Sequence, residues 1–225
     1  MFQAIYDSPW HSPAFYWLVA FVFLVLVVRR LPWLTAFLVL FTFEIAADAL
    51  ATGGWSLLII EKSRWLTPVA ITFVILGDFR FFLLVERFAR PRTEPLGLRG
   101  WATAIALAFV VPVSSHLVTV AFPSAFVESR MTFLTYEAMF LTLALVLRFV
   151  ILPRRLARSD EPVRRWLLAV ASFEIVQYAL WALADVLILS GMSWAFLVRI
   201  VPNSLYYAFF LPFVWRTAPR EAETW

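Results

Sequence analysis

Residues 101–122 read WATAIALAFVVPVSSHLVTVAF, and this stretch determines the fold class that we predict. It contains no Asp, Glu, Lys or Arg, and as a helix rising about 1.5 Å per residue it can cross the roughly 30 Å hydrocarbon core of a bilayer. Six other apolar segments, bounded by Pro, Gly and charged residues, meet the same criterion. They run from about Pro13 to Val28, Pro32 to Thr52, Trp65 to Val85, Met131 to Leu152, Val163 to Ser190 and Trp194 to Trp215. We therefore predict an all-α integral membrane protein, a bundle of seven transmembrane helices forming one domain over residues 1–225.

The composition favours the same class. Of the 225 residues, 63% are hydrophobic and only 15% are charged, whereas soluble domains carry about 25% charged residues. The net charge of +4 comes from basic residues in short connections between apolar spans, and membrane topology accounts for these better than nucleic-acid binding does. The chain has no cysteine, which excludes disulfides, thiolate metal sites and a cysteine nucleophile.

The distribution of basic residues predicts the orientation, because short cytoplasmic loops collect Lys and Arg. The connections on one side hold thirteen arginines: Arg29, Arg30, Arg87, Arg90, Arg92, Arg99, Arg154, Arg155, Arg158, Arg164, Arg165, Arg216 and Arg220. The other side holds Lys62, Arg64 and Arg130. We predict an external N-terminus and a cytoplasmic C-terminus in the cell (inner) membrane. The Arg-rich, Lys-poor basic set is compatible with a bacterium of high genomic GC content.

A short sequence match suggests an internal repeat. Phe43-Glu44-Ile45 followed by Ala49-Leu50 in the second predicted span reappears, with the same spacing, as Phe173-Glu174-Ile175 followed by Ala179-Leu180 in the sixth. One interpretation is a duplication of two parallel three-helix units, residues 13–88 and 131–216, joined by the helix at 101–122, as in some transporter folds. The other is chance agreement between apolar helices.

Ionisable residues inside the spans are the candidate functional residues, because each costs a few kcal/mol at the bilayer centre unless it faces a partner or water. Counting residues from each span end places one group near the midplane, and we predict that it forms a solute or ion site. Its members are Glu44, Asp48, Asp78, Glu174 and Asn203. Because acids predominate here, the site should hold protons, a cation or a basic ligand. The alternative is that protonated acids only hydrogen-bond between helices.

A second group is predicted to form a gate or an ion-pair cluster. Its members are Arg80, His116, Glu137, Asp185 and Arg199. Four of them, all except Arg80, come from consecutive spans at similar depth nearer the outside. Under the functional interpretation they gate or bind a polar solute. Under the structural interpretation, Arg199 neutralises Asp185 or Glu137 and locks the bundle.

Familiar catalytic and cofactor motifs do not occur. The sequence has no Gly-rich phosphate loop, no Gly-x-Ser-x-Gly elbow and no His-Glu-x-x-His run, so we predict a protein that is not an enzyme and binds no metal or cofactor. The predicted topology invites comparison with microbial rhodopsins and SWEET transporters. However, the span Trp194 to Trp215 lacks the lysine that would bind retinal, and the internal prolines do not match the SWEET pattern. The likeness is one of architecture, which does not imply function.

Two functions remain open. The first is a small secondary transporter or proton- or cation-coupled carrier with the midplane acidic site, acting on a polar or cationic small solute. The second is a non-transporting membrane subunit or sensor that assembles with a partner protein through its helices and Arg-rich loops. The predicted partners are membrane lipids and, according to the function, the solute, a membrane-protein partner or a second copy of the chain.

Overall fold

The structure, a computed structural model, describes residues 1–8, 32–52, 56, 63–90, 94–157, 159–220 and 222. Within these ranges the chain is helical and contains no strand. The elements are α1 (Phe2–Tyr6), α3 (Pro32–Thr52), α5 (Leu66–Phe88), α6 (Leu98–Ala121), the 3-10 turn η2 (Pro123–Ala125), α7 (Ser129–Val146), the π-helical segment η3 (Leu147–Ile151), α8 (Leu152–Arg155), α9 (Glu161–Leu189), α10 (Ala195–Ser204), the π-helical segment η4 (Leu205–Phe209) and α11 (Phe210–Thr217).

Six helical stretches are long and apolar enough to cross a membrane. They are Trp33–Thr52, Pro68–Phe88, Leu98–Ala121, Arg130–Arg155, Glu161–Leu189 and Ala195–Thr217. The all-helical class is thereby confirmed, and six of the seven predicted segments are helices with the length and apolar composition of a membrane span. The other predicted span, Pro13 to Val28, lies outside the described residues. For the same reason the proposed repeat of residues 13–88 and 131–216 stays a prediction.

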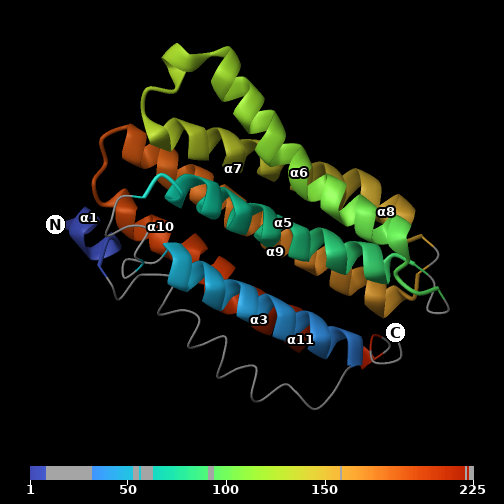
Figure 1. Ribbon diagram of the computed structural model, residues 1–225. Coiled ribbons are helices and arrows are strands. Elements are labelled where there is room, and N and C mark those ends of the chain that lie inside the picture. Colours follow the sequence, from blue (N-terminus) through green and yellow to red (C-terminus); the bar gives the residue numbers. More distant parts are fainter. Residues whose placement is uncertain are drawn as a thin grey trace.

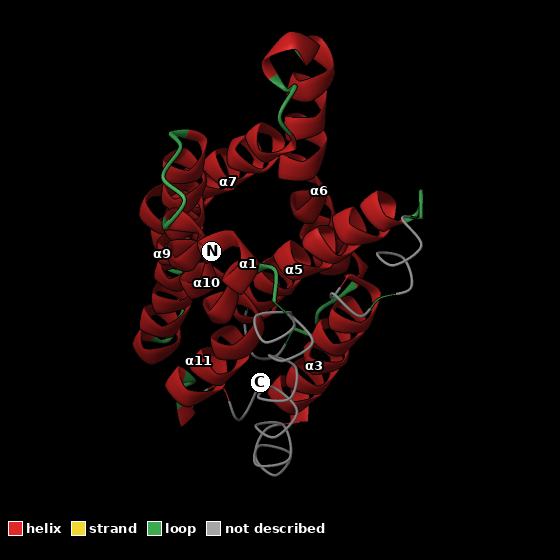
Figure 2. Cartoon of the chain, turned by 90° about the vertical axis from the view of Figure 1, so that its left-hand side faces the viewer, coloured by secondary structure: helices red, strands yellow, loops and turns green. Residues whose placement is uncertain are grey.

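The spans form a closed ring of neighbours. Along the ring, α3 contacts α5, α5 contacts α6, α6 contacts α7, α7 contacts α9, α9 contacts α10 and α11, and α11 returns to α3. Successive spans alternate in direction, and the connection between α6 and α7 extends away from the other helices (Figure 1). Viewed along the bundle, α10 lies beside α9, and the short α1 packs against α10 (Figure 2).

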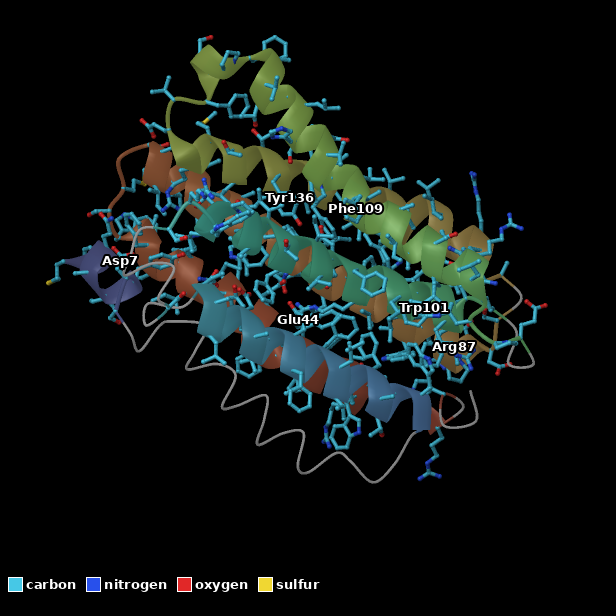
Figure 3. All side chains as sticks on the ribbon, in the orientation of Figure 1. Asp7, Glu44, Arg87, Trp101, Phe109 and Tyr136 are labelled. Carbon is cyan, nitrogen blue, oxygen red and sulfur yellow. The ribbon has the colours of Figure 1, made fainter. Side chains whose placement is uncertain are left out.

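The two ends of the bundle differ. We call them the α1 end, where α1 lies, and the Glu86 end, where α5 finishes and α8 and α9 meet. Asp7 and Arg87 mark these two ends in Figure 3, and Glu44 lies between them. The buried face of α6 is formed largely by small residues, Gly100, Ala104, Ala108 and Ser115, which allow its backbone to approach the neighbouring helices closely.

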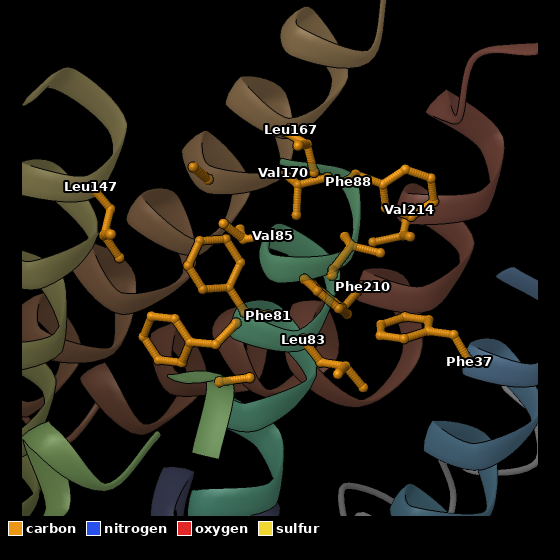
Figure 4. Close-up of a cluster of buried hydrophobic side chains, with 14 of the residues drawn as sticks. Phe37, Phe81, Leu83, Val85, Phe88, Leu147, Leu167, Val170, Phe210 and Val214 are labelled. Atoms are coloured by element: carbon orange, nitrogen blue, oxygen red, sulfur yellow. The ribbon is translucent and has the colours of Figure 1, made fainter. Parts of the chain in front are cut away.

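An apolar core fills the Glu86 end (Figure 4). The ring of Phe88 meets that of Trp166 edge-on with centroids 4.8 Å apart, and Trp166 Nε1 donates to the Val214 carbonyl over 3.1 Å. Phe37 and Phe81 are also almost fully buried. Aromatic and aliphatic side chains from α3, α5, α9 and α11 thus leave this end of the bundle closed.

The last span is not a regular α-helix. Pro202 lies inside α10, and the π-helical segment η4 begins three residues later, at Leu205. A proline cannot donate the backbone hydrogen bond of a helix interior, and π-helical turns leave backbone groups open to other partners. The sequence predicts a break near Pro202, and in the structure the hydrogen-bonding pattern changes just C-terminal to it.

Candidate functional site: a polar and aromatic cavity at the α1 end

An ion-pair cluster joins four helices near the α1 end. Arg199 of α10 pairs with Asp185 of α9 and, with 3.1 Å between Nη1 and Oε1, with Glu137 of α7. Arg130, at the start of α7, also binds Asp185, with Nη1 2.7 Å from Oδ1. Arg199 Nε donates to the hydroxyl of Tyr6 in α1 over 3.2 Å. Because both carboxylates are buried, the two arginines neutralise charges that would otherwise strongly destabilise the bundle.

A cavity of about 460 Å³ lies against this cluster. Four of the predicted site residues line it: Asp48, Glu137, Arg199 and Asn203. Asn203 is fixed by its neighbours, since its Oδ1 accepts a hydrogen bond from Trp181 Nε1 over 2.6 Å. Small-molecule sites occupy about 300–1,000 Å³ and combine apolar walls with a few polar groups. The cavity has the size and lining of such a site.

Asp78 lies behind the cavity wall. Its Oδ2 accepts a hydrogen bond from the Tyr136 hydroxyl over 2.5 Å, and its Oδ1 accepts one from the Tyr178 hydroxyl over 2.8 Å. The two hydroxyls are 3.3 Å apart, and both tyrosines line the cavity. Asp78 itself is only 2% exposed and is not a lining residue. The tyrosine pair therefore connects the cavity to a buried carboxyl group near the middle of α5.

Arg80 occupies the middle of the bundle and is fully buried. Its guanidinium lies over the rings of Tyr206 and Phe210, at 4.1 and 4.3 Å from their centroids, and its Nη2 donates to the Tyr206 carbonyl over 3.2 Å. Glu44 and Glu174 interact with it electrostatically, but neither forms an ion pair with it in the described part of the chain. Within that same part, both carboxylate oxygens of Glu44, and Nε and Nη1 of Arg80, have no hydrogen-bond partner.

A second ion pair lies at the opposite end. Glu86 is fully buried, and Arg155 of α8 holds both of its carboxylate oxygens, over 2.5 and 2.7 Å. Arg90 adds a longer contact of 3.5 Å. This pairing ties α5 to α8 beneath the apolar core, so the Glu86 end is closed by both packing and charge.

The two predicted groups are thus rearranged in part. In the predicted midplane group, Asp48 and Asn203 line the cavity, Asp78 lies behind the tyrosine pair, and Glu44 and Glu174 lie near Arg80. Of the predicted gate group, Glu137, Asp185 and Arg199 lie together as ion pairs. The structure does not bring the other two members, Arg80 and His116, into this cluster, since Arg80 lies deeper and His116 is exposed on α6.

Several residues of the site are not predicted from the sequence. The positions of the apolar spans place Arg130 in an external connection, and Tyr6 precedes the first predicted span. Tyr136 and Tyr178 lie in apolar spans, where tyrosine carries no signal of its own. The one usable signal is depth in the span, because each tyrosine lies close to a predicted site residue. Tyr136 directly precedes Glu137, and Tyr178 follows Glu174 by one helical turn.

Neither a metal site nor a known relative identifies the chain. Among the described residues, no group of three or more His, Asp and Glu side chains could hold a metal ion. Comparison with known protein families finds no match, nor does comparison with curated proteins or with solved structures. Function therefore has to be inferred from the geometry of the cavity.

Proposed function

We propose that this protein is a small membrane carrier that binds a polar or cationic solute in the cavity at the α1 end. The observation that carries the proposal is the cavity itself, which is lined by Asp48, Glu137, Arg199 and Asn203 within a helical bundle of membrane-spanning length. A bundle with a purely structural role has no need for a cavity of this size between its helices, with charged and amide side chains in its wall. Carriers characteristically bind solutes near interrupted helices, and here the π-helical segment η4 contributes to the cavity wall.

The difference between the two ends supports a carrier mechanism. The cavity lies at the α1 end, whereas the apolar core and the Glu86–Arg155 pair close the opposite end. Transport would require the cavity to close at the α1 end and the Glu86 end to open. Ion pairs such as Glu86–Arg155 are suited to opening and closing the ends of the bundle, because their partners can separate when water enters.

Asp78 is our proposed coupling group. A buried carboxyl group connected to a solute cavity through two hydroxyls can gain or lose a proton when the cavity is wet. Glu174, which lies deeper beside Arg80, is the second candidate for proton or cation coupling.

We also propose seven crossings in a bacterial inner membrane, with the N-terminus outside, so that the α1 end faces outward. The support is the apolar segment Pro13 to Val28 together with the alternating placement of the arginines. We further propose that the chain has no enzymatic activity, needs no cofactor and does not bind nucleic acid.

The test is gradient-driven flux in proteoliposomes. At least one of the three concentration jumps, in protons, Na⁺ or K⁺, should produce a current with the wild-type protein. Asp78→Asn and Glu174→Gln should each reduce these currents by about tenfold or more, since hydrogen bonds to charged groups contribute about 1.5–3 kcal/mol. Glu161→Gln, at an exposed position at the start of α9, is the matched control and should leave them unchanged.

Absence of any gradient-driven current in the wild-type protein would contradict the carrier, as would currents that stay unchanged in both variants. A stable partner protein that co-purifies with a non-transporting chain would instead favour the membrane subunit or sensor.

A further inference from the structure

Aromatic rings follow one another around the cavity. Tyr136 and Tyr178 have ring centroids 6.1 Å apart, and Tyr178 meets Trp181 edge-on at 5.2 Å. Trp181 continues to Tyr206 at 5.4 Å, and Tyr206 to Tyr207 at 4.7 Å. All five residues line the cavity. The faces of aromatic rings attract cations, and tryptophan is the strongest of them, so a chain of rings from α7 to η4 offers a positive ligand many favourable contacts.

The fixed charges of the wall leave a negative excess. Arg130 and Arg199 are both engaged by Asp185, and Arg199 also by Glu137. Asp48, on the α3 side, forms no ion pair among the described residues; Arg80 acts on it only through longer-range electrostatics, and its hydrogen bonds come from neutral donors. These are the Thr52 hydroxyl, 2.7 Å from Oδ1, and the Tyr207 hydroxyl. One carboxylate of the cavity therefore has no cation of its own in the described part of the chain.

The ion-pair cluster also leaves acceptors free. Glu137 Oε2 and Asp185 Oδ2 are buried and have no hydrogen-bond partner among the described residues, although the other oxygen of each carboxylate is paired with arginine. Unsatisfied buried acceptors are costly. A ligand that supplies N–H donors could reach Glu137, which lines the cavity, and satisfy one of them.

From the ring chain, the unpaired Asp48 and the open acceptor on Glu137, we infer that the ligand of this cavity is a monovalent organic cation, a protonated amine with an apolar body. The inference depends on the proposed function, because it names the class of solute that the carrier binds. The aromatic rings supply extended apolar contacts that an organic cation can use and a small inorganic ion cannot, and about 460 Å³ is ample for a small amine.

The test uses three probes that share one carbon skeleton and differ in charge: phenethylamine, 2-phenylethanol and phenylacetate. Their binding to the purified full chain in detergent is measured by isothermal titration calorimetry near neutral pH. Phenethylamine should bind about tenfold more tightly than 2-phenylethanol, because a cation gains both the rings and Asp48, and phenylacetate should bind most weakly.

Variants of Asp48 test whether this residue causes the preference for the amine over the alcohol. Asp48→Asn should remove the advantage of phenethylamine over 2-phenylethanol and leave the affinity for 2-phenylethanol unchanged. Asp48→Glu keeps the charge and should retain most of that advantage. Glu161→Gln is the matched control for removing an acid far from the cavity. If Asp48→Asn fails to fold, as judged by gel filtration and circular dichroism, the ranking of the three probes by the wild-type protein still decides the inference.

Equal or tighter binding of 2-phenylethanol or phenylacetate would overturn the cation inference, and so would a phenethylamine advantage that survives in Asp48→Asn. If the amine does not bind but gradient-driven currents occur, this inference alone fails and the carrier stands. If no probe binds and no current occurs, the carrier fails as well.

Discussion

Replacing Arg199 by methionine should lower the free energy of unfolding by about 3 kcal/mol, the lower end of the range for breaking a buried ion pair. The side chain of Arg199 is only 11% exposed and pairs with Glu137 and Asp185, whose side chains are 4% and 0% exposed. Methionine preserves much of the length but leaves Glu137 without a cation. Arg130 still holds Asp185, which is why we expect the lower end of the range. Reversible unfolding in mixed detergent micelles measures the difference.

The control for this change is Arg216→Met. Arg216 is exposed in the last turn of α11, so its loss should change stability by less than about 0.5 kcal/mol. Adding Glu137→Gln to Arg199→Met removes the uncompensated charge and should recover part of the loss. If Arg199→Met is as stable as the control, the cluster does not hold the bundle together.

Gly77→Ala should lower the free energy of unfolding by about 1–3 kcal/mol, as overpacking of a well-packed interior does. A Cβ at position 77 would lie 1.7 Å from the hydroxyl oxygen of Tyr206 and 2.6 Å from its Cζ. The Tyr206 ring would have to move, and that ring lies against the Arg80 guanidinium. The change should therefore destabilise the bundle even though alanine is the better helix former. The same unfolding experiment measures it.

Gly97→Ala supplies the comparison. Gly97 is the N-cap of α6, and a Cβ there would meet no atom within 4 Å, so its replacement brings no overpacking and should cost about 1 kcal/mol or less, the N-cap preference for glycine over alanine. A Gly77→Ala protein that is as stable as wild type, or more stable, would mean that Tyr206 does not pack on α5.

The sequence was sufficient to predict the all-helical class and six helices long and apolar enough to span a membrane, because a run of about 20 apolar residues is typical of a transmembrane helix. It also placed Glu137, Asp185 and Arg199 at similar depth, and in the structure these three form ion pairs. Ionisable residues in spans must find partners, and these three lie at similar depths in neighbouring helices.

The sequence was insufficient to predict which way each residue faces. The span around His116 has apolar residues on every face and no charged residue, so its pattern does not show which face meets the bundle and which faces away. In the structure His116 is exposed, away from the cluster at whose depth it was placed. Arg130 shows the opposite case. The sequence places it in an external connection, but in the structure it lies at the start of α7 and pairs with the buried carboxylate of Asp185.

The sequence also does not show which side chains line the cavity and which lie in the protein core. Tyr136 and Tyr178 hold Asp78 from two different helices, and only the packing of α7 against α9 brings their hydroxyls to 3.3 Å. A tyrosine in an apolar span is compatible with a core position, an interface position or a cavity wall. The three-dimensional arrangement decides among these.

The most direct test of the central claim, a solute cavity open at the α1 end and closed at the Glu86 end, is labelling of single cysteines. The chain has no cysteine of its own, so each introduced thiol is the only one present. Ala70 lines the cavity, whereas Leu84 is 0% exposed in the core about 21 Å further along the same helix. In right-side-out vesicles, a membrane-impermeant maleimide should label Ala70→Cys and leave Leu84→Cys unlabelled. Equal labelling of the two positions, or an unreactive Ala70→Cys, would contradict the account.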